Sequence, residues 1–112
     1  MLTEDKKRAA YRALQDRIVN GEGRAPREQR ARAFANRGLS EPLDRLLGNV
    51  AARPTQVTDA DFTAARAAGF TEDEVFELVI CAAVGQSARQ YDAGLAALAE
   101  AVAGEEEGEE DG

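Results

Sequence analysis

The chain contains no histidine, no tryptophan and only one cysteine among its 112 residues. A single thiol cannot form a disulfide within the chain, which excludes a disulfide-stapled secreted domain. Without histidine, the side chain that most often serves as general base or metal ligand near neutral pH is absent. No apolar run approaches the roughly 18 residues of a membrane span. The length predicts one domain with a modest core.

The net charge of −7 hides a strong asymmetry along the chain. Residues 1–37 contain ten of the 14 Lys and Arg against five acids, whereas six acids fall within residues 105–111. Such asymmetry can indicate nucleic-acid binding. The cations are spread around helical turns with no aromatic platform beside them, so we favour a solvated helical surface, facing acidic segments of a neighbouring subunit. No nucleic-acid or membrane partner is expected.

The acidic end of the chain, residues 104–112, has nothing to bury and is predicted to be a disordered tail. It would keep the protein soluble or, as an alternative, mimic a polyanion for a basic partner. The first eight residues lack the apolar core of a signal peptide, so a cytoplasmic location is expected.

The spacing of apolar residues predicts an all-α fold in which a short helix is followed by a long C-terminal helix. The expected helices cover residues 3–19, 26–37, 41–53, 58–68 and 72–103, with Ser40 as the N-cap of the third. Two starts carry strong signals, since Thr58 precedes Asp61 and Thr71 precedes Glu74 at the spacing of a capping box. Gly69 between them is a natural helix stop.

The long helix is apolar nearly all round from Val75 to Val84, which predicts burial on several sides. A narrower heptad-like seam then follows, made of Val84, Ala88, Tyr91, Leu95, Leu98 and Val102. Such a seam suits docking against another helix, so a homo-oligomer through residues 72–103 is predicted. Gly85 and Gly94 are expected where a neighbouring backbone comes close, with a kink at Gly85 as the alternative.

The segment from Val57 to Leu78 joins a short helix ending in Ala-Ala-Gly to a capped acidic turn and a long apolar helix. It resembles the repeated signature of the alkylhydroperoxidase-like (carboxymuconolactone decarboxylase) family, and the resemblance extends through Leu98, about half the chain. It implies an all-α fold that forms trimers or hexamers through its helices. Peroxidatic members carry a Cys-x-x-Cys pair and a histidine, where this sequence has Pro54, Val57 and Asp61. A divergent member without the usual disulfide cycle is therefore expected.

Four residues are weak catalytic candidates: Cys81, Glu77, Arg89 and Tyr91. Burial and the carboxylate of Glu77 one turn earlier should raise the pKa of the Cys81 thiol, and no cation within its own subunit is expected beside it. Glu77 would pair with Arg89 or Arg66, or serve as a general acid or base. Arg89 and Tyr91 would line an anion pocket or, as we prefer, join a hydrogen-bond network between subunits.

No cofactor or metal is expected, and Asp61 and Glu74 are interpreted as helix caps. The sequence thus favours an oligomeric helical binding or scaffold protein. The alternative is an enzyme, either a peroxiredoxin-like antioxidant or a decarboxylase relative, that uses Cys81 or Glu77 with Arg89.

Overall fold

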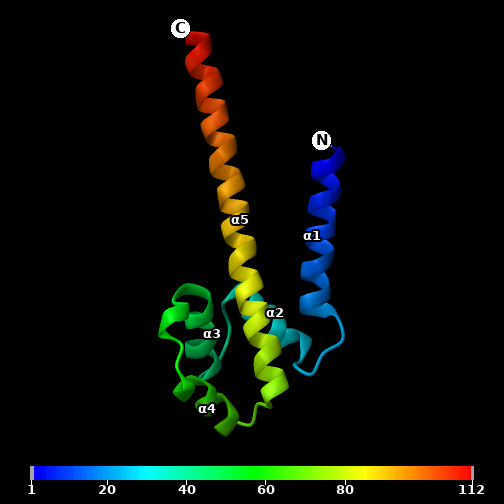
Figure 1. Cartoon of the computed structure of the whole chain (residues 1–112), viewed down its shortest axis with the longest axis vertical. Helices are drawn as coiled ribbons and strands as arrows, with labels where there is room; N and C mark the ends of the chain where they lie inside the picture. Colours follow the sequence, from blue (N-terminus) through cyan, green and yellow to red (C-terminus); the bar gives the residue numbers. More distant parts are fainter. Residues whose placement is uncertain (1, 112) are drawn as a thin grey trace.

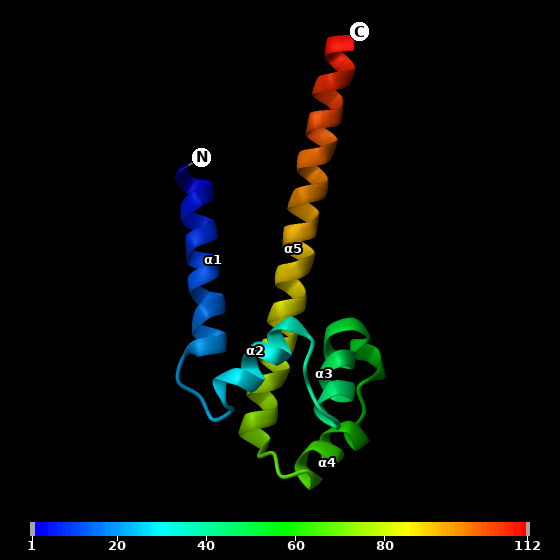
Figure 2. The same ribbon diagram turned by 180° about the vertical axis from the view of Figure 1, so that it is seen from behind.

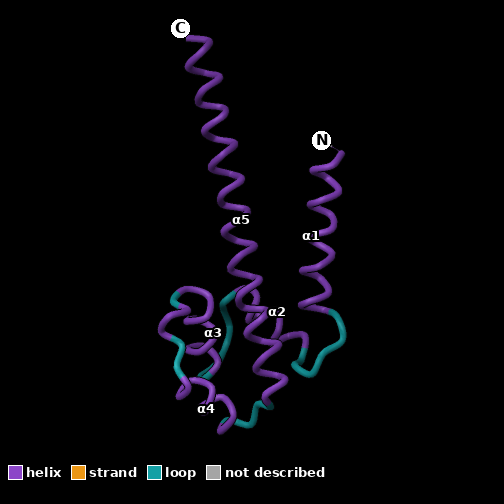
Figure 3. The backbone as a smooth tube through the Cα atoms, viewed as in Figure 1, coloured by secondary structure: helices purple, strands orange, loops and turns teal. Residues whose placement is uncertain are grey.

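The computed structural model describes the backbone of residues 2–111 and the side chains of residues 5–105. Within that range the ordered elements are all helical, which confirms the all-α prediction and its long C-terminal helix (Figure 3). They are α1 (Leu2–Asn20), α2 (Arg27–Ala35), α3 (Leu43–Ala52), the short 3-10 helix η1 (Pro54–Gln56), α4 (Asp59–Ala67) and α5 (Glu72–Asp111).

The helices divide the molecule into two regions. Helices α2, α3 and α4 gather around the first half of α5, and we call residues 21–90 the body (Figure 1). Helix α1 and the second half of α5, residues 91–111, extend away from the body on the same side, and we call them the arm (Figure 2). The arm makes the molecule long and thin, with extents of 64 × 29 × 20 Å.

The core lies in the body, where α3 packs its apolar stripe against α5. The largest fully buried side chains are Leu46, Leu47, Leu78 and Cys81. Helices α2 and α4 meet this core through Ala33 and Ala65, both fully buried. Small residues at these two contacts let the short helices lie close to the core. The apolar run of α5 from Val75 to Val84 is buried at Val75, Leu78, Cys81 and Ala82 but leaves Phe76 66 % exposed, so the prediction of burial on several sides is confirmed only in part.

Both predicted capping boxes are present. The Asp61 carboxylate accepts the Thr58 backbone N–H at 3.0 Å. At the start of α5, the Thr71 N–H donates to Glu74 Oε1 at 3.0 Å, and the Glu74 N–H donates to the Thr71 hydroxyl at 3.2 Å. These bonds satisfy backbone donors that a helix start leaves without partners.

The predicted stop at Gly69 is also confirmed. Gly69 has φ of +102°, in the left-handed region that glycine adopts cheaply. Its N–H donates to the Arg66 carbonyl, and the next N–H, of Phe70, donates to the Ala65 carbonyl at 3.2 Å. This is the hydrogen-bond pattern of a Schellman motif, which turns the chain from α4 into α5.

The prediction that Ser40 caps α3 is wrong. The helix begins at Leu43, with Pro42 in the cap position and no side-chain cap. Because a residue that precedes proline is disfavoured in the α conformation, Glu41 cannot continue a helix started at Ser40. The Ser40 carbonyl instead accepts the Asp44 N–H at 3.1 Å in the turn before the helix.

The two glycines of α5 differ in their surroundings. A Cβ at Gly85 would lie 1.9 Å from the Phe34 carbonyl oxygen, so α2 approaches the α5 backbone here as predicted. Helix α5 runs through this position as one element. At Gly94 no atom lies within 4 Å of such a Cβ, so the expected close neighbour is not found within the described chain.

Helix α5 extends past residue 103, where the sequence predicts its end, and continues to Asp111. Glutamate is a good helix former, which fits this continuation. The disorder predicted for residues 104–112 stays a prediction, because the side chains of 106–111 and residue 112 lie outside the described part. None of the helices, over the residues searched, combines the length and apolar content that a membrane crossing requires.

Candidate functional site

The only thiol lies where α5 meets the end of α1. Cys81 is fully buried, as the sequence predicts, and its sulfur has no exposed surface. The thiol donates to the Ile18 backbone carbonyl, with 3.7 Å between sulfur and oxygen. This hydrogen bond holds the protonated form of the sulfur, and the surrounding core keeps water away from it.

Arg30 belongs to the same cluster and is not among the residues that the sequence singles out. Its side chain lies in α2, only 4 % exposed, and its Nε donates to the Ala25 carbonyl at 3.0 Å. Its Nη1 donates at 3.3 Å to the same Ile18 carbonyl that accepts from Cys81. The expectation that no cation lies near the thiol is therefore wrong. The available signal was the four-residue step from Arg30 to Phe34, which places both on one helix face.

Glu77 binds the loop between α1 and α2. Its two carboxylate oxygens accept the backbone N–H groups of Arg24 at 2.8 Å and Ala25 at 2.7 Å. Gly23 leaves space for this contact, since a Cβ there would lie 3.1 Å from both oxygens. Successive backbone N–H groups that converge on one anion form a nest. The partners predicted for Glu77, Arg66 and Arg89, are thus replaced by backbone donors that no side-chain pattern reveals.

Hydrogen bonds shift the pKa of Glu77, and burial shifts the pKa of Cys81. The N–H groups of Ala25 and Arg24 hold the pKa of Glu77 below its usual value, helped by the positive charges of Arg30 and Arg24. Burial raises the pKa of the Cys81 thiol, as predicted. Arg30 opposes that rise and Glu77 adds to it. A thiol with a raised pKa is a weak nucleophile at neutral pH, because the thiolate is the reactive form.

Arg89 and Tyr91 serve other parts of the molecule. Arg89 donates through Nη1 to the Phe34 carbonyl at 2.5 Å and through Nη2 to Gln86 Oε1 at 3.0 Å. It therefore caps the C-terminal end of α2, where a cation is favourable. Tyr91 packs on Tyr11, with ring centroids 5.5 Å apart. The structure thus brings Cys81 and Glu77 into one cluster and leaves Arg89 and Tyr91 outside its hydrogen bonds.

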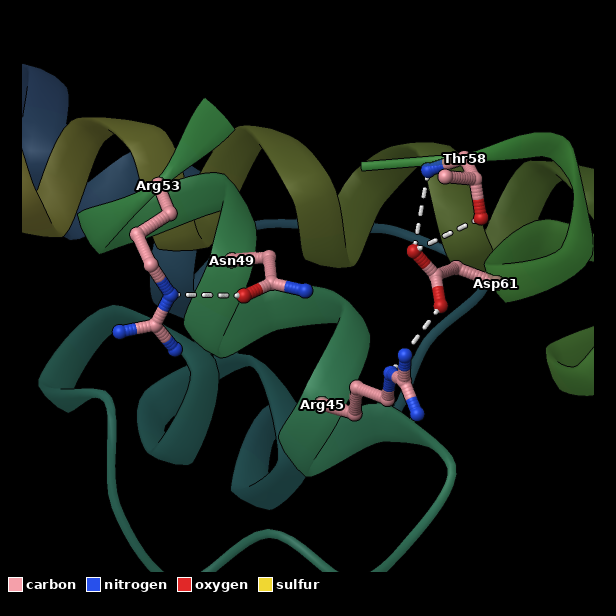
Figure 4. Close-up of polar contacts among 5 residues, drawn as sticks. All are labelled: Arg45, Asn49, Arg53, Thr58 and Asp61. Atoms are coloured by element: carbon pink, nitrogen blue, oxygen red, sulfur yellow. Dashed lines mark hydrogen bonds and ion pairs between the residues drawn. The ribbon is translucent and has the colours of Figure 1, made fainter. Parts of the chain in front are cut away.

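Figure 4 shows the region that would hold the peroxidatic residues if the family signature applied. Asp61 accepts the Thr58 N–H at 3.0 Å and its hydroxyl at 3.3 Å, and its other oxygen lies 3.6 Å from Arg45 Nε. Nearby, Arg53 donates to Asn49 Oδ1 at 3.2 Å. The carboxylate of Asp61 is therefore occupied by a helix cap and an ion pair, as its interpretation as a cap predicts.

An apolar groove between α4 and the start of α5 was not predicted. Phe76 stands 66 % exposed in it, the largest exposed fraction among the exposed large hydrophobic side chains. The groove encloses about 580 Å³ and is lined by Asp59, Phe62, Arg66, Glu72, Val75, Phe76 and Val79. Four of its seven lining residues are apolar and could pack against a hydrophobic group, and the other three are charged. The sequence signal was present, since Phe76 and Val79 are part of the all-round apolar run.

Among the side chains of residues 5–105, no group of three metal-ligating residues comes together. Comparison with protein-family models finds no match for this chain, nor does comparison with curated proteins or with solved structures. The resemblance to the alkylhydroperoxidase-like family therefore rests on the motifs from Val57 to Leu78.

Proposed function

We propose that this chain is a divergent member of the alkylhydroperoxidase-like family that acts as an oligomeric helical binding or scaffold protein, without peroxidatic disulfide chemistry. The observation that carries the proposal is the complete burial of the Cys81 sulfur, which donates to a backbone carbonyl and has a raised pKa. A redox or nucleophilic cysteine needs an accessible thiolate.

The other polar candidates support the same proposal, because each has a structural partner. Glu77 is held by two backbone N–H groups, Arg89 caps α2, and Asp61 caps α4. A general acid or base must reach a substrate proton within hydrogen-bond distance. These groups would first have to give up contacts that hold the loop and helix ends in place.

One observation favours the alternative, an enzyme of the peroxiredoxin or decarboxylase type. The positive charge of Arg30 lies close enough to Cys81 to oppose the rise that burial causes in the thiol pKa, and both groups donate to the Ile18 carbonyl. If the loop of residues 21–25 opened, this cation would stabilise a thiolate. Burial outweighs this effect in the closed structure, so the alternative requires that opening.

Thiol titration separates the two functions. The native protein is mixed with an aromatic disulfide reagent at pH 7, and the rate is compared with that of the chain unfolded in guanidinium. We expect the native thiol to react at least ~100-fold more slowly, since opening of a core site costs several kcal/mol. A Ser87→Cys variant supplies an exposed thiol on the same helix as a control for the reagent. Rapid reaction of native Cys81 would overturn the proposal.

A further inference from the structure

We propose that the arm is the docking surface for a second copy of this chain, which lies antiparallel so that the basic α1 of each copy faces the acidic half of α5 in the other. The proposal rests on the oligomeric part of the proposed function and adds the surface, the orientation and the charges that decide it. Three independent features of the molecule support it: its surface area, the placement of exposed apolar side chains, and the separation of charge.

The surface area exceeds that of a compact monomer. A folded chain of 12.0 kDa is expected to expose on the order of 6,000 Å², whereas this chain exposes 7933 Å². Its radius of gyration is 18.1 Å, against about 13 Å for a compact domain of this length. A standard interface buries roughly 800 Å² on each partner. The arm therefore exposes enough extra surface for a stable pair.

Apolar side chains on the arm are uncovered. Of the five large hydrophobic residues exposed among the described side chains, four lie on the arm: Leu14, Tyr91, Leu98 and Val102. Leu98 is 61 % exposed. Tyr91, Leu98 and Val102 belong to the seam whose spacing predicts contact with one neighbouring helix. Tyr11 covers part of Tyr91, and no other ring among the side chains of residues 5–105 stacks on the seam.

The arm also separates charge between its two helices. Lys6, Lys7, Arg8, Arg12 and Arg17 of α1 are all exposed, and none forms an ion pair with a described side chain. From Gln90 onward the sequence contains eight acids and no Lys or Arg. Among the described side chains, the opposite charges of these neighbouring helices form no ion pair. A second copy can pair them at the cost of little rearrangement.

Charge decides the orientation. Parallel arms would place the acidic ends of α5 side by side, where like charges repel. Antiparallel arms place each acidic half of α5 along the basic α1 of the other copy, and a two-fold axis makes this contact twice. The arm is thus complementary to itself. A basic protein of another kind would pair with the acids of α5, but the cations of α1 would repel it. A second copy of this chain, which carries both charges, is therefore favoured as the occupant.

A charge swap tests the proposal. The first variant carries Arg8→Glu and Arg12→Glu on α1, and the second carries Glu100→Lys and Glu105→Lys on α5. When two copies of the same variant pair, the changed helix of one copy meets a helix of the same charge in the other. We therefore expect the Kd for self-association to rise about tenfold or more at low salt, as for several weakened ion pairs. An equal mixture should associate as tightly as the unmodified chain, because each variant then meets its opposite. Sedimentation velocity measures both.

Further variants keep the outcome clear. The matched control is Arg37→Glu with Arg66→Glu, which changes the same charge on exposed positions of the body and should leave the Kd unchanged. Circular dichroism confirms that every variant is folded. A nitroxide on Ser87→Cys, an exposed site at the body end of the arm, in a Cys81→Ala background, should give no short distance between the two labels, whereas parallel arms would bring them together.

The possible results separate this inference from the proposed function. Restored association of the mixture supports the antiparallel pair. If the chain is oligomeric but the swaps have no effect, or if the labels lie close together, the antiparallel pair is wrong and the oligomeric scaffold remains. If the unmodified chain is a monomer at high concentration, both proposals fail. A reactive native thiol would overturn the scaffold function and leave the pairing of arms intact.

Discussion

The two halves of α5 show how one helix can serve two purposes. In the body, the apolar run from Val75 to Val84 supplies Val75, Leu78, Cys81 and Ala82 to the core shared with α2, α3 and α4, while Phe76 stays exposed. In the arm, a narrow stripe continues on the same helix, and Leu98 and Val102 remain exposed. The width of the apolar face therefore distinguishes the two regions: a wide face is buried by several helices of its own chain, and a narrow stripe fits one partner.

The polar residues of the body and of the arm differ in whether they have partners within the chain. In the body, Glu77, Arg30 and Arg89 each bind backbone groups that loops or helix ends leave without partners. In the arm, the charges of α1 and α5 are exposed and make no described ion pair. Polar groups in the body thus hold one fold together, whereas those in the arm remain available to another molecule.

The largest expected difference between the regions is in the cost of removing a leucine. Leu78→Ala removes a fully buried side chain and should lower the free energy of unfolding by about 3 kcal/mol. Leu98→Ala in dilute solution should change it by less than about 0.5 kcal/mol, because the side chain is exposed. Guanidinium titration followed by circular dichroism measures both. Equal losses would show that the arm is part of the same core.

The junction between α4 and α5 and the burial of Cys81 could be predicted from the sequence because they follow from local patterns, whereas the start of α3 and the end of α5 could not. The capping boxes at Thr58 and Thr71 and the stop at Gly69 depend on residues within one or two turns. The burial of Cys81 follows from the apolar run around it. The start of α3 was misplaced because the restriction that Pro42 imposes on Glu41 outweighs the capping tendency of Ser40.

Replacing a glycine of α5 by alanine should also affect the stability of the body and of the arm differently. In the body, Gly85→Ala would place a Cβ 1.9 Å from the Phe34 carbonyl, and the backbones must separate to accept it. We expect a loss of at least about 2 kcal/mol in the free energy of unfolding. In the arm, Gly94→Ala meets no atom within 4 Å and should stabilise the helix by about 0.5–1 kcal/mol in dilute solution. Thermal melts measure both effects. Changes in Tm of the same sign for the two variants would contradict the expected difference between body and arm.

The contacts of the candidate site were less predictable, because they join segments far apart in the sequence. Glu77 binds N–H groups more than 50 residues away, and backbone donors carry no side-chain signature. The side-chain pattern alone therefore points to arginine partners for this carboxylate. Arg30 was missed for a related reason, since its partners are the carbonyls of Ile18 and Ala25. Only the folded loop brings these groups together.

The smallest of these effects concerns the carboxylate that holds the loop to α5. Glu77→Gln retains one acceptor oxygen and places an amide N–H₂ opposite the other backbone donor, so we expect a loss of about 1–2 kcal/mol at pH 7. Glu22→Gln is the matched control, because Glu22 lies exposed in the same loop and makes no described hydrogen bond. It should change the free energy of unfolding by less than about 0.5 kcal/mol.

The pH dependence of this loss tests its cause. Folding lowers the pKa of Glu77 below its ordinary value of 4.5, so the unfolded chain binds the proton more readily than the native one. The contribution of Glu77 is therefore complete above that ordinary value and declines as the pH falls through the lower native pKa. The difference in unfolding free energy between the unmodified chain and Glu77→Gln should accordingly shrink from pH 7 towards pH 3. A difference that stayed constant over this range would show that the charge of Glu77 does not hold the loop. The charge of Glu77 in the body would then contribute no more to the stability of the fold than the exposed charges of the arm.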